Sequence, residues 1–88
     1  MPETQESIKE QIRQWVAETA ERKGVSFTSD DESLTANGVI DSLAIFRLVS
    51  FLEETFGLRV ADEEIVNDNF KSVNEIDRFV TGKLGSKA

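Results

Sequence analysis

Apolar side chains recur at helical spacing in several separate stretches of this 88-residue chain. The pattern predicts three longer helices, over residues 4–23, 42–56 and 72–83, and one short helix over residues 62–66. Gly24 and Gly57 directly follow the first two stretches, where glycine commonly ends a helix. In residues 25–40 the apolar side chains do not recur at any regular spacing. This segment is rich in Ser, Thr, Asp, Asn and Gly, a composition typical of a loop. The expected fold class is therefore all-α, a small four-helix bundle with a long loop between its first two helices.

The stretch over residues 42–56 has the broadest apolar stripe in the chain. The positions expected to be buried are spaced three and four apart: Leu43, Phe46, Val49, Leu52 and Phe56, with Ile45 and Leu48 beside them. A stripe this broad predicts packing against more than one neighbour. The positions expected on the opposite face, towards partner proteins, are Ala44, Arg47, Ser50 and Glu54.

The residues before this helix predict how it begins. Asn37 and Gly38 form a strong turn signal, and Asp41 is a good N-cap residue. Ser42 is therefore expected in the first turn of the helix, with its hydroxyl exposed at the N-terminal end. The positive end of the helix dipole would lie close by, so a phosphate attached to Ser42 would be well placed. Alternatively, Asp41 and Ser42 are capping residues and have no further role.

The residue inventory argues against an enzyme. The chain has neither His nor Cys, so a serine nucleophile would lack its usual base, and no thiol nucleophile is present. Pairs of carboxylates such as Glu53 and Glu54 fall on exposed helix turns, where burial would not raise a pKa for acid catalysis. The sequence shows neither a glycine-rich phosphate loop nor the spacing of a metal site. We expect no catalytic residues and no metal ligands.

Charge limits the range of partners. The formal net charge is −7, and between residues 24 and 70 ten acidic residues stand against only Arg47 and Arg59. Nucleic acid would be repelled, whereas basic protein surfaces are the natural complement. No stretch has the length and apolar character of a membrane span or a secretory leader, so we expect a cytoplasmic monomer without membrane contact.

Gly38, Asp41, Ser42 and Leu43 together give the pattern Gly-x-x-Asp-Ser-Leu at the expected start of the second helix. On this motif, and on the order of helices around it, nearly the whole chain resembles the acyl carrier protein family. The resemblance implies that residues 1–88 form one carrier domain with the bundle fold of that family. It also implies that Ser42 carries 4′-phosphopantetheine as a covalent cofactor.

The same resemblance implies a set of partners. A phosphopantetheinyl transferase would move the arm from coenzyme A onto Ser42, and a ligase would load an acyl or aminoacyl group as a thioester. Acyltransferases or synthases of a lipid, polyketide or related biosynthetic pathway would then use that group. Residues 31–34 (Asp-Glu-Ser-Leu) imitate the motif, but no helical apolar run follows Ser33, so Ser33 is not an expected attachment site.

In the family, acidic residues along the second helix contact basic patches on partner enzymes, and Asp41, Glu53 and Glu54 fit this role. Ala44 and Arg47 stand where acidic residues are usual in carriers of fatty-acid synthesis, which favours a specialised stand-alone carrier. A cargo pocket between the second and third helices would be lined by Ile45, Phe46, Leu48, Val49, Ile65 and Val66. The alternative function is a helical protein-interaction domain of the same fold that carries no arm.

Overall fold

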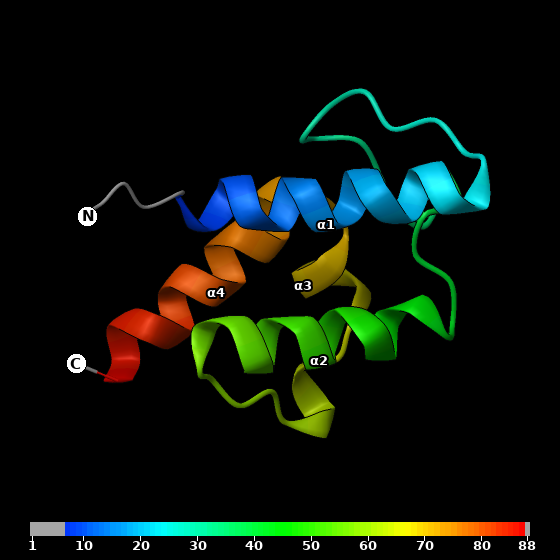
Figure 1. Ribbon diagram of the computed structural model, residues 1–88. Coiled ribbons are helices and arrows are strands. Elements are labelled where there is room, and N and C mark those ends of the chain that lie inside the picture. Colours follow the sequence, from blue (N-terminus) through cyan, green and yellow to red (C-terminus); the bar gives the residue numbers. More distant parts are fainter. Residues whose placement is uncertain (1–6, 88) are drawn as a thin grey trace.

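The computed structural model describes residues 7–87, and this part of the chain is helical without any strand. Its elements are α1 (Ile8–Lys23), α2 (Ala44–Phe56), one 3-10 turn η1 (Asp62–Glu64), α3 (Asn67–Phe70) and α4 (Val73–Lys87). Figure 1 shows α1 and α2 running in opposite directions, with α4 packed against both α1 and the short α3. The predicted all-α fold, with a long loop between the first two helices, is confirmed.

Local signals set both ends of α1. The Ser7 hydroxyl accepts a hydrogen bond from the amide of Glu10 at 3.1 Å, which caps the start of the helix. Gly24 ends it with a φ of 72°, a left-handed conformation that costs glycine little. The helix was predicted to begin at residue 4, but Ser7 has an extended backbone and the helix begins at Ile8; residues 4–6 lie outside the described residues.

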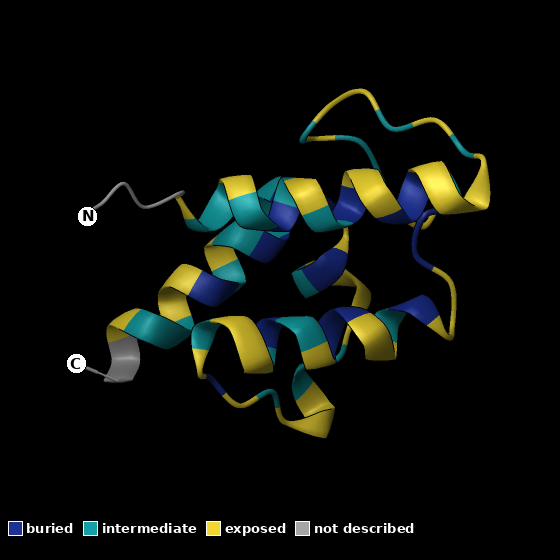
Figure 2. Ribbon diagram, in the orientation of Figure 1, coloured by how far each residue is buried: buried dark blue, intermediate teal, exposed yellow. Residues whose placement is uncertain are grey.

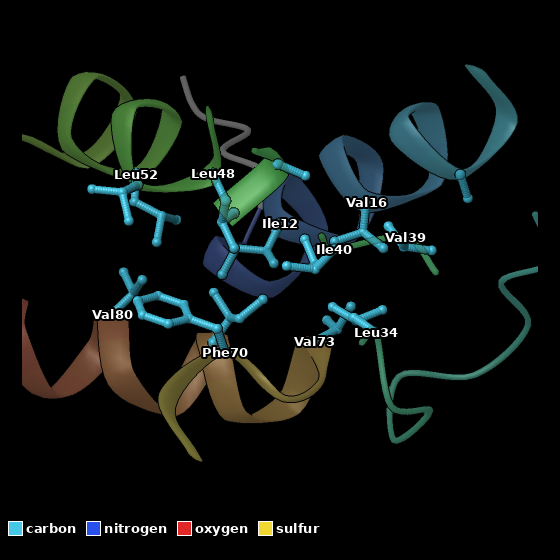
Figure 3. Packing of buried hydrophobic residues seen from close by; sticks show 14 of the residues in the cluster. Ile12, Val16, Leu34, Val39, Ile40, Leu48, Leu52, Phe70, Val73 and Val80 are labelled. Atoms are coloured by element: carbon cyan, nitrogen blue, oxygen red, sulfur yellow. The ribbon is translucent and has the colours of Figure 1, made fainter. Parts of the chain in front are cut away.

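Buried side chains from every helix, and from the long loop, meet in one core. Figure 3 shows these side chains pointing towards one another, and Figure 2 shows the buried positions facing the interior. The largest fully buried members are Phe70, Ile12, Leu34, Leu48, Leu52, Ile76, Val16, Val39, Val73 and Val80. Since the chain has no cysteine, this packing holds the fold together without disulfides.

The loop between α1 and α2 is fixed by polar contacts as well as by burial. Leu34 is fully buried, and its amide donates to the carbonyl of Lys71 at 2.8 Å. The Arg13 guanidinium binds the carboxylate of Asp30 through Nε at 2.9 Å and Nη2 at 2.6 Å. These contacts fix the path of the loop and therefore the position at which α2 begins.

The buried face of α2 differs from the one predicted. The buried residues are Ala44, Leu48, Val49 and Leu52, whereas Leu43 is 69% exposed and Phe46 is 60% exposed. The expectation that Ala44 points outwards is therefore wrong, and so is the expectation that Leu43 and Phe46 are buried. The physical reason is that Ala44, Leu48 and Leu52 lie four residues apart and form one row along the helix. This row faces the core and turns Phe46 away from it.

The second half of the chain also departs from the predicted helix boundaries. Residues 62–66 do not form one helix, because Ile65 and Val66 have non-helical backbone (ψ 73° and 155°) after η1. The next helix, α3, begins at Asn67, outside the predicted helices, and places Phe70 in the core.

The last helix, α4, continues to Lys87 rather than ending near residue 83. Neither Gly82 nor Gly85 has a positive φ, so neither acts as a left-handed cap. Lys83, at the predicted end of the helix, pairs with Glu64 at 2.7 Å, and this ion pair links α4 to η1. None of the helices in the described part of the chain is long and apolar enough to cross a lipid bilayer.

Candidate functional site at the start of α2

Asp41 lies just before α2 and binds backbone amides at the start of this helix. Its Oδ1 atom accepts hydrogen bonds from the amides of Leu43 at 3.0 Å and Ala44 at 2.7 Å. The backbone carbonyl of Asp41 accepts a hydrogen bond from the amide of Ile45 at 3.1 Å. This bond has the spacing of a helical hydrogen bond, although Asp41 precedes Ala44, the first residue of α2. Asp41 therefore caps the helix as its type and position predict, and Ser42 lies in the turn that leads into it.

Lys23, the last residue of α1, holds Asp41 from the other side. Its Nζ atom lies 2.7 Å from Asp41 Oδ2 and donates at 3.0 Å to the carbonyl oxygen of Val39. One ammonium group thus connects the end of α1 both to the loop and to the cap. Hydrogen bonds from Lys23 and from the Ala44 and Leu43 amides, with the charge of Lys23, lower the pKa of Asp41 to about 2. Asp41 is ionised at neutral pH.

The turn before Asp41 depends on Asn37 and Gly38. Gly38 has a φ of 88°, a backbone angle that residues other than glycine rarely adopt. Asn37 Oδ1 accepts from the amide of Val39 at 3.0 Å, and Asn37 Nδ2 donates to Glu32 Oε2 at 2.8 Å. This turn directs Val39 and Ile40 into the core and leaves Asp41 and Ser42 exposed.

Ser42 is exposed, and within the described part of the chain its hydroxyl makes no hydrogen bond. The amides of Leu43 and Ala44 are already bound to Asp41. A phosphate on Ser42 would therefore gain from the helix dipole rather than from these two amides. The Lys23 ammonium offsets the charge of Asp41, which lowers the repulsion that a phosphate beside Asp41 would meet. The site thus fits a phosphate ester on Ser42.

A pocket of about 330 Å³ opens beside Ser42. Its lining comes from the loop, from the start of α2 and from the segment through α3: Thr35, Ile40, Asp41, Ser42, Ile45, Ile65, Val66, Asn67 and Phe70. Most of these side chains are apolar, and the volume falls in the range of small-molecule sites. An apolar group tethered to Ser42 would therefore find an apolar surface next to its point of attachment.

The predicted cargo-pocket residues separate into two groups. Ile45, Ile65 and Val66 line the pocket beside Ser42. Val49 and Leu48 are buried in the core, and the exposed Phe46 lines a different hollow on the outer face of α2. The structure therefore brings together three of these residues with Ser42.

The residues considered for partner docking also occupy different environments. Arg47 and Glu54 are exposed and line the outer hollow. Glu53 is half-buried, and its carboxylate accepts from the amide of Val60 at 3.0 Å, which links α2 to the segment after it. Asp41 is exposed but occupied by its cap bonds and by Lys23. Ala44 is buried at 6% exposure and lines the hollow between α1 and α2.

Lys23 is a site residue that the sequence does not single out. A cation in the last turn of a helix is sufficiently explained by the helix dipole, so its position alone does not indicate a contact with Asp41. Its contact with Asp41 spans 18 residues and depends on the path of the loop. The sequence signal for this pair is weak: cations at the end of one helix, Arg22 and Lys23, and an acidic cap in front of the next.

The model of the phosphopantetheine attachment site family matches residues 10–80, which is most of the chain. The chain therefore belongs to this family. Together with the helical bundle, the match makes it a member of the acyl carrier protein class, whose members carry 4′-phosphopantetheine covalently on a serine. Such carrier domains are typically non-catalytic, and they interact with phosphopantetheinyl transferases and biosynthetic enzymes. The comparison with curated proteins gave no match.

Proposed function

We propose that this protein is not an enzyme but a carrier that holds acyl or aminoacyl groups at Ser42 and passes them between biosynthetic enzymes. The observation that supports the proposal most strongly is the exposed hydroxyl of Ser42 at the start of α2, in a chain of the attachment-site family. Among the serines, Ser42 alone has the Asp-Ser-Leu context followed by a helix. When bound, the phosphopantetheine arm supplies a terminal thiol on which the carried group is held as a thioester.

The side chains of this protein position the Ser42 hydroxyl and do not take part in catalysis. Asp41 caps α2, and Lys23 holds Asp41, so the Ser42 hydroxyl is offered at a fixed position to an enzyme that modifies it. Ile45, Ile65 and Val66 offer an apolar surface beside that hydroxyl. We propose that the apolar part of a carried group is sheltered there.

We further propose that a phosphopantetheinyl transferase, a loading ligase and downstream acyltransferases or synthases dock in turn on this end of the molecule. Contacts of this kind must be brief, and exposed charges favour fast association with modest affinity. Arg47 and Glu54 are exposed on α2, where such partners would meet them. The cation Arg47 supports a specialised pathway, such as polyketide, non-ribosomal or modified-lipid synthesis, over the general synthesis of fatty acids.

The proposal is tested by incubating the purified protein with a broad-specificity phosphopantetheinyl transferase, magnesium and coenzyme A, and then measuring its intact mass. We expect a gain of one phosphopantetheine group in the parent protein. The variant Ser42→Ala should show no gain, whereas Ser33→Ala, which changes the imitating motif, should gain mass as the parent does. A parent protein that stays unmodified would favour the alternative of an interaction domain without an arm.

A further inference from the structure

The outer face of α2 carries two large apolar side chains that the fold does not bury. Leu43 is 69% exposed and Phe46 is 60% exposed, although most apolar residues of α2 face the core. They border an open hollow of about 480 Å³. Its lining is Leu43, Phe46, Arg47, Ser50, Phe51 and Glu54, which we call the Phe46 face. Adjoining exposed apolar side chains of this size are typical of a surface that a partner covers.

The charge around this face differs in sign from the charge of the molecule. A second hollow, between α1 and α2, shares Leu43 and Arg47 with the Phe46 face and adds Arg22, Lys23 and Asp41. Lys23 and Asp41 pair with each other at 2.7 Å. The remaining charges of the two hollows are Arg22 and Arg47 against Glu54. A chain with a net charge of −7 therefore presents a locally positive, apolar surface next to Ser42.

Arg47 is the central charge of this surface. It is exposed, and it forms no ion pair with any residue that the structure describes. Glu54 also lines the Phe46 face, but no contact joins its carboxylate to Arg47 within those residues. The guanidinium is thus available to a carboxylate of another molecule, which it can bind through two parallel hydrogen bonds.

We propose that the Phe46 face docks partner proteins whose contact surface presents an apolar side chain flanked by carboxylates. The apolar group would cover Leu43 and Phe46, and a carboxylate would pair with Arg47. This inference rests on the proposed carrier function, since the partners would be the enzymes that act at Ser42. It reverses the expectation from net charge alone, which favours basic partners.

A second copy of the chain fits this face less well. A twofold contact would place the Phe46 face against itself, where Arg47 of each copy could pair with Glu54 of the other, an acid that also lines this hollow. Each copy also carries a net charge of −7, which opposes association of two copies. Charge complementarity therefore favours a different protein with acidic groups at the contact.

The test uses two synthetic amphipathic helical peptides with the same apolar face, one flanked by glutamates and the other by lysines. Each is titrated into isotope-labelled protein while amide signals are followed by NMR. We expect the glutamate peptide to bind more tightly and to shift the signals of Leu43, Phe46 and Arg47. Arg47→Glu should weaken this binding roughly fivefold or more, since the ion pair becomes a repulsion. Phe46→Ala should weaken it about tenfold.

Arg59→Glu is the matched control, because Arg59 is also exposed but lies outside both hollows. It changes the net charge equally and should weaken binding of the glutamate peptide less than about twofold. Arg47→Glu should also improve binding of the lysine peptide. The inference is overturned if the parent prefers the lysine peptide, if neither peptide binds at the Phe46 face, or if Arg47→Glu and Arg59→Glu have equal effects.

The same protein samples are also treated with the transferase and weighed. A sample that gains the arm at Ser42 but shows no preference for the glutamate peptide overturns the docking inference and leaves the carrier function in place. A sample that prefers the glutamate peptide but never gains the arm contradicts the carrier function instead. The two failures are therefore distinguishable.

Discussion

The ammonium group of Lys23 lies 2.7 Å from the carboxylate of Asp41, so the last residue of α1 is joined to the residue that precedes Ser42. The same ammonium group binds the carbonyl of Val39, two residues earlier in the chain. Asp41 in turn caps α2 through the amides of Leu43 and Ala44. The position of Ser42 therefore depends on a contact between the end of α1 and the turn that leads into α2.

Replacing Lys23 should loosen this arrangement without removing the hydroxyl. We expect Lys23→Met to slow phosphopantetheinylation of Ser42 severalfold, because Asp41 and the adjoining backbone lose their common partner. Lys23→Arg should retain most of the parent rate, since a guanidinium can still pair with Asp41. The measurement is the initial rate of mass gain as a function of protein concentration. Lys71→Met, at an exposed lysine outside this site, serves as the control. Equal rates for Lys23→Met and the parent would contradict the positioning role.

Asp41 predicts a particular pH dependence of stability. Its pKa is lowered in the folded protein to about 2, mainly by the hydrogen bond from Lys23. The stabilisation from the ionised carboxylate is therefore fully present above its ordinary pKa of about 4 and is lost as the pH falls towards about 2. In urea denaturation, the stability advantage of the parent over Asp41→Asn should stay level between about pH 7 and pH 5, and decline below about pH 4.

The comparison between these two proteins isolates Asp41. The pKa values of Asp30 and Glu64 are also lowered, by hydrogen bonds from Arg13 and Lys83, but both carboxylates are present in parent and variant alike. An advantage of the parent that persists unchanged down to about pH 2 would show that the Lys23–Asp41 contact does not stabilise the fold.

Truncation of two apolar residues of α2 should change the stability of the protein to very different extents. Leu48 is fully buried, so Leu48→Ala should lower the free energy of unfolding by about 2–5 kcal/mol. Phe46 is the larger side chain but is 60% exposed, so Phe46→Ala should change this free energy by no more than about 0.5 kcal/mol. Thermal or chemical denaturation measures both. A large loss in Phe46→Ala would mean that Phe46 belongs to the core and that the Phe46 face is not an exposed surface.

The acidic character of the chain predicts a salt effect. Between residues 24 and 70 ten acidic residues stand against two arginines, and only some of these acids pair with cations elsewhere in the chain. Screening should reduce their mutual repulsion, so the melting temperature should rise between low and moderate ionic strength. A divalent cation should have the same effect. A melting temperature that stays level or falls would show that the ion pairs outweigh the repulsion.

The sequence predicted well those features that depend on neighbouring residues. The cap at Asp41 and the left-handed ends at Gly24 and Gly57 follow from local backbone chemistry, and the structure has them at those positions. The fold class followed from helical periodicity for the same reason. Local signals placed Ser42 in the first turn of the helix over residues 42–56, whereas α2 begins at Ala44 and Ser42 lies in the turn just before it.

The buried row of α2 was predicted wrongly although the sequence holds a local signal for it. In a helical projection Leu43 and Phe46 fall on the side of Arg47, Ser50 and Glu54, whereas Ala44 falls on the side of Leu48 and Leu52. Spacings of three and four taken alone do not separate these two sides. The contact between Lys23 and Asp41 could not be predicted, because it requires the loop to fold back, which no local pattern specifies.

If the hydroxyl of Ser42 is the attachment point of the arm, the modification can be located there after treatment of the protein with transferase and coenzyme A. Protease digestion followed by tandem mass spectrometry assigns the added mass to one residue. We expect the added mass on Ser42, with Ser33 and all other serines unmodified. Added mass on Ser33 or another residue, with an unmodified Ser42 in the same sample, would contradict this expectation.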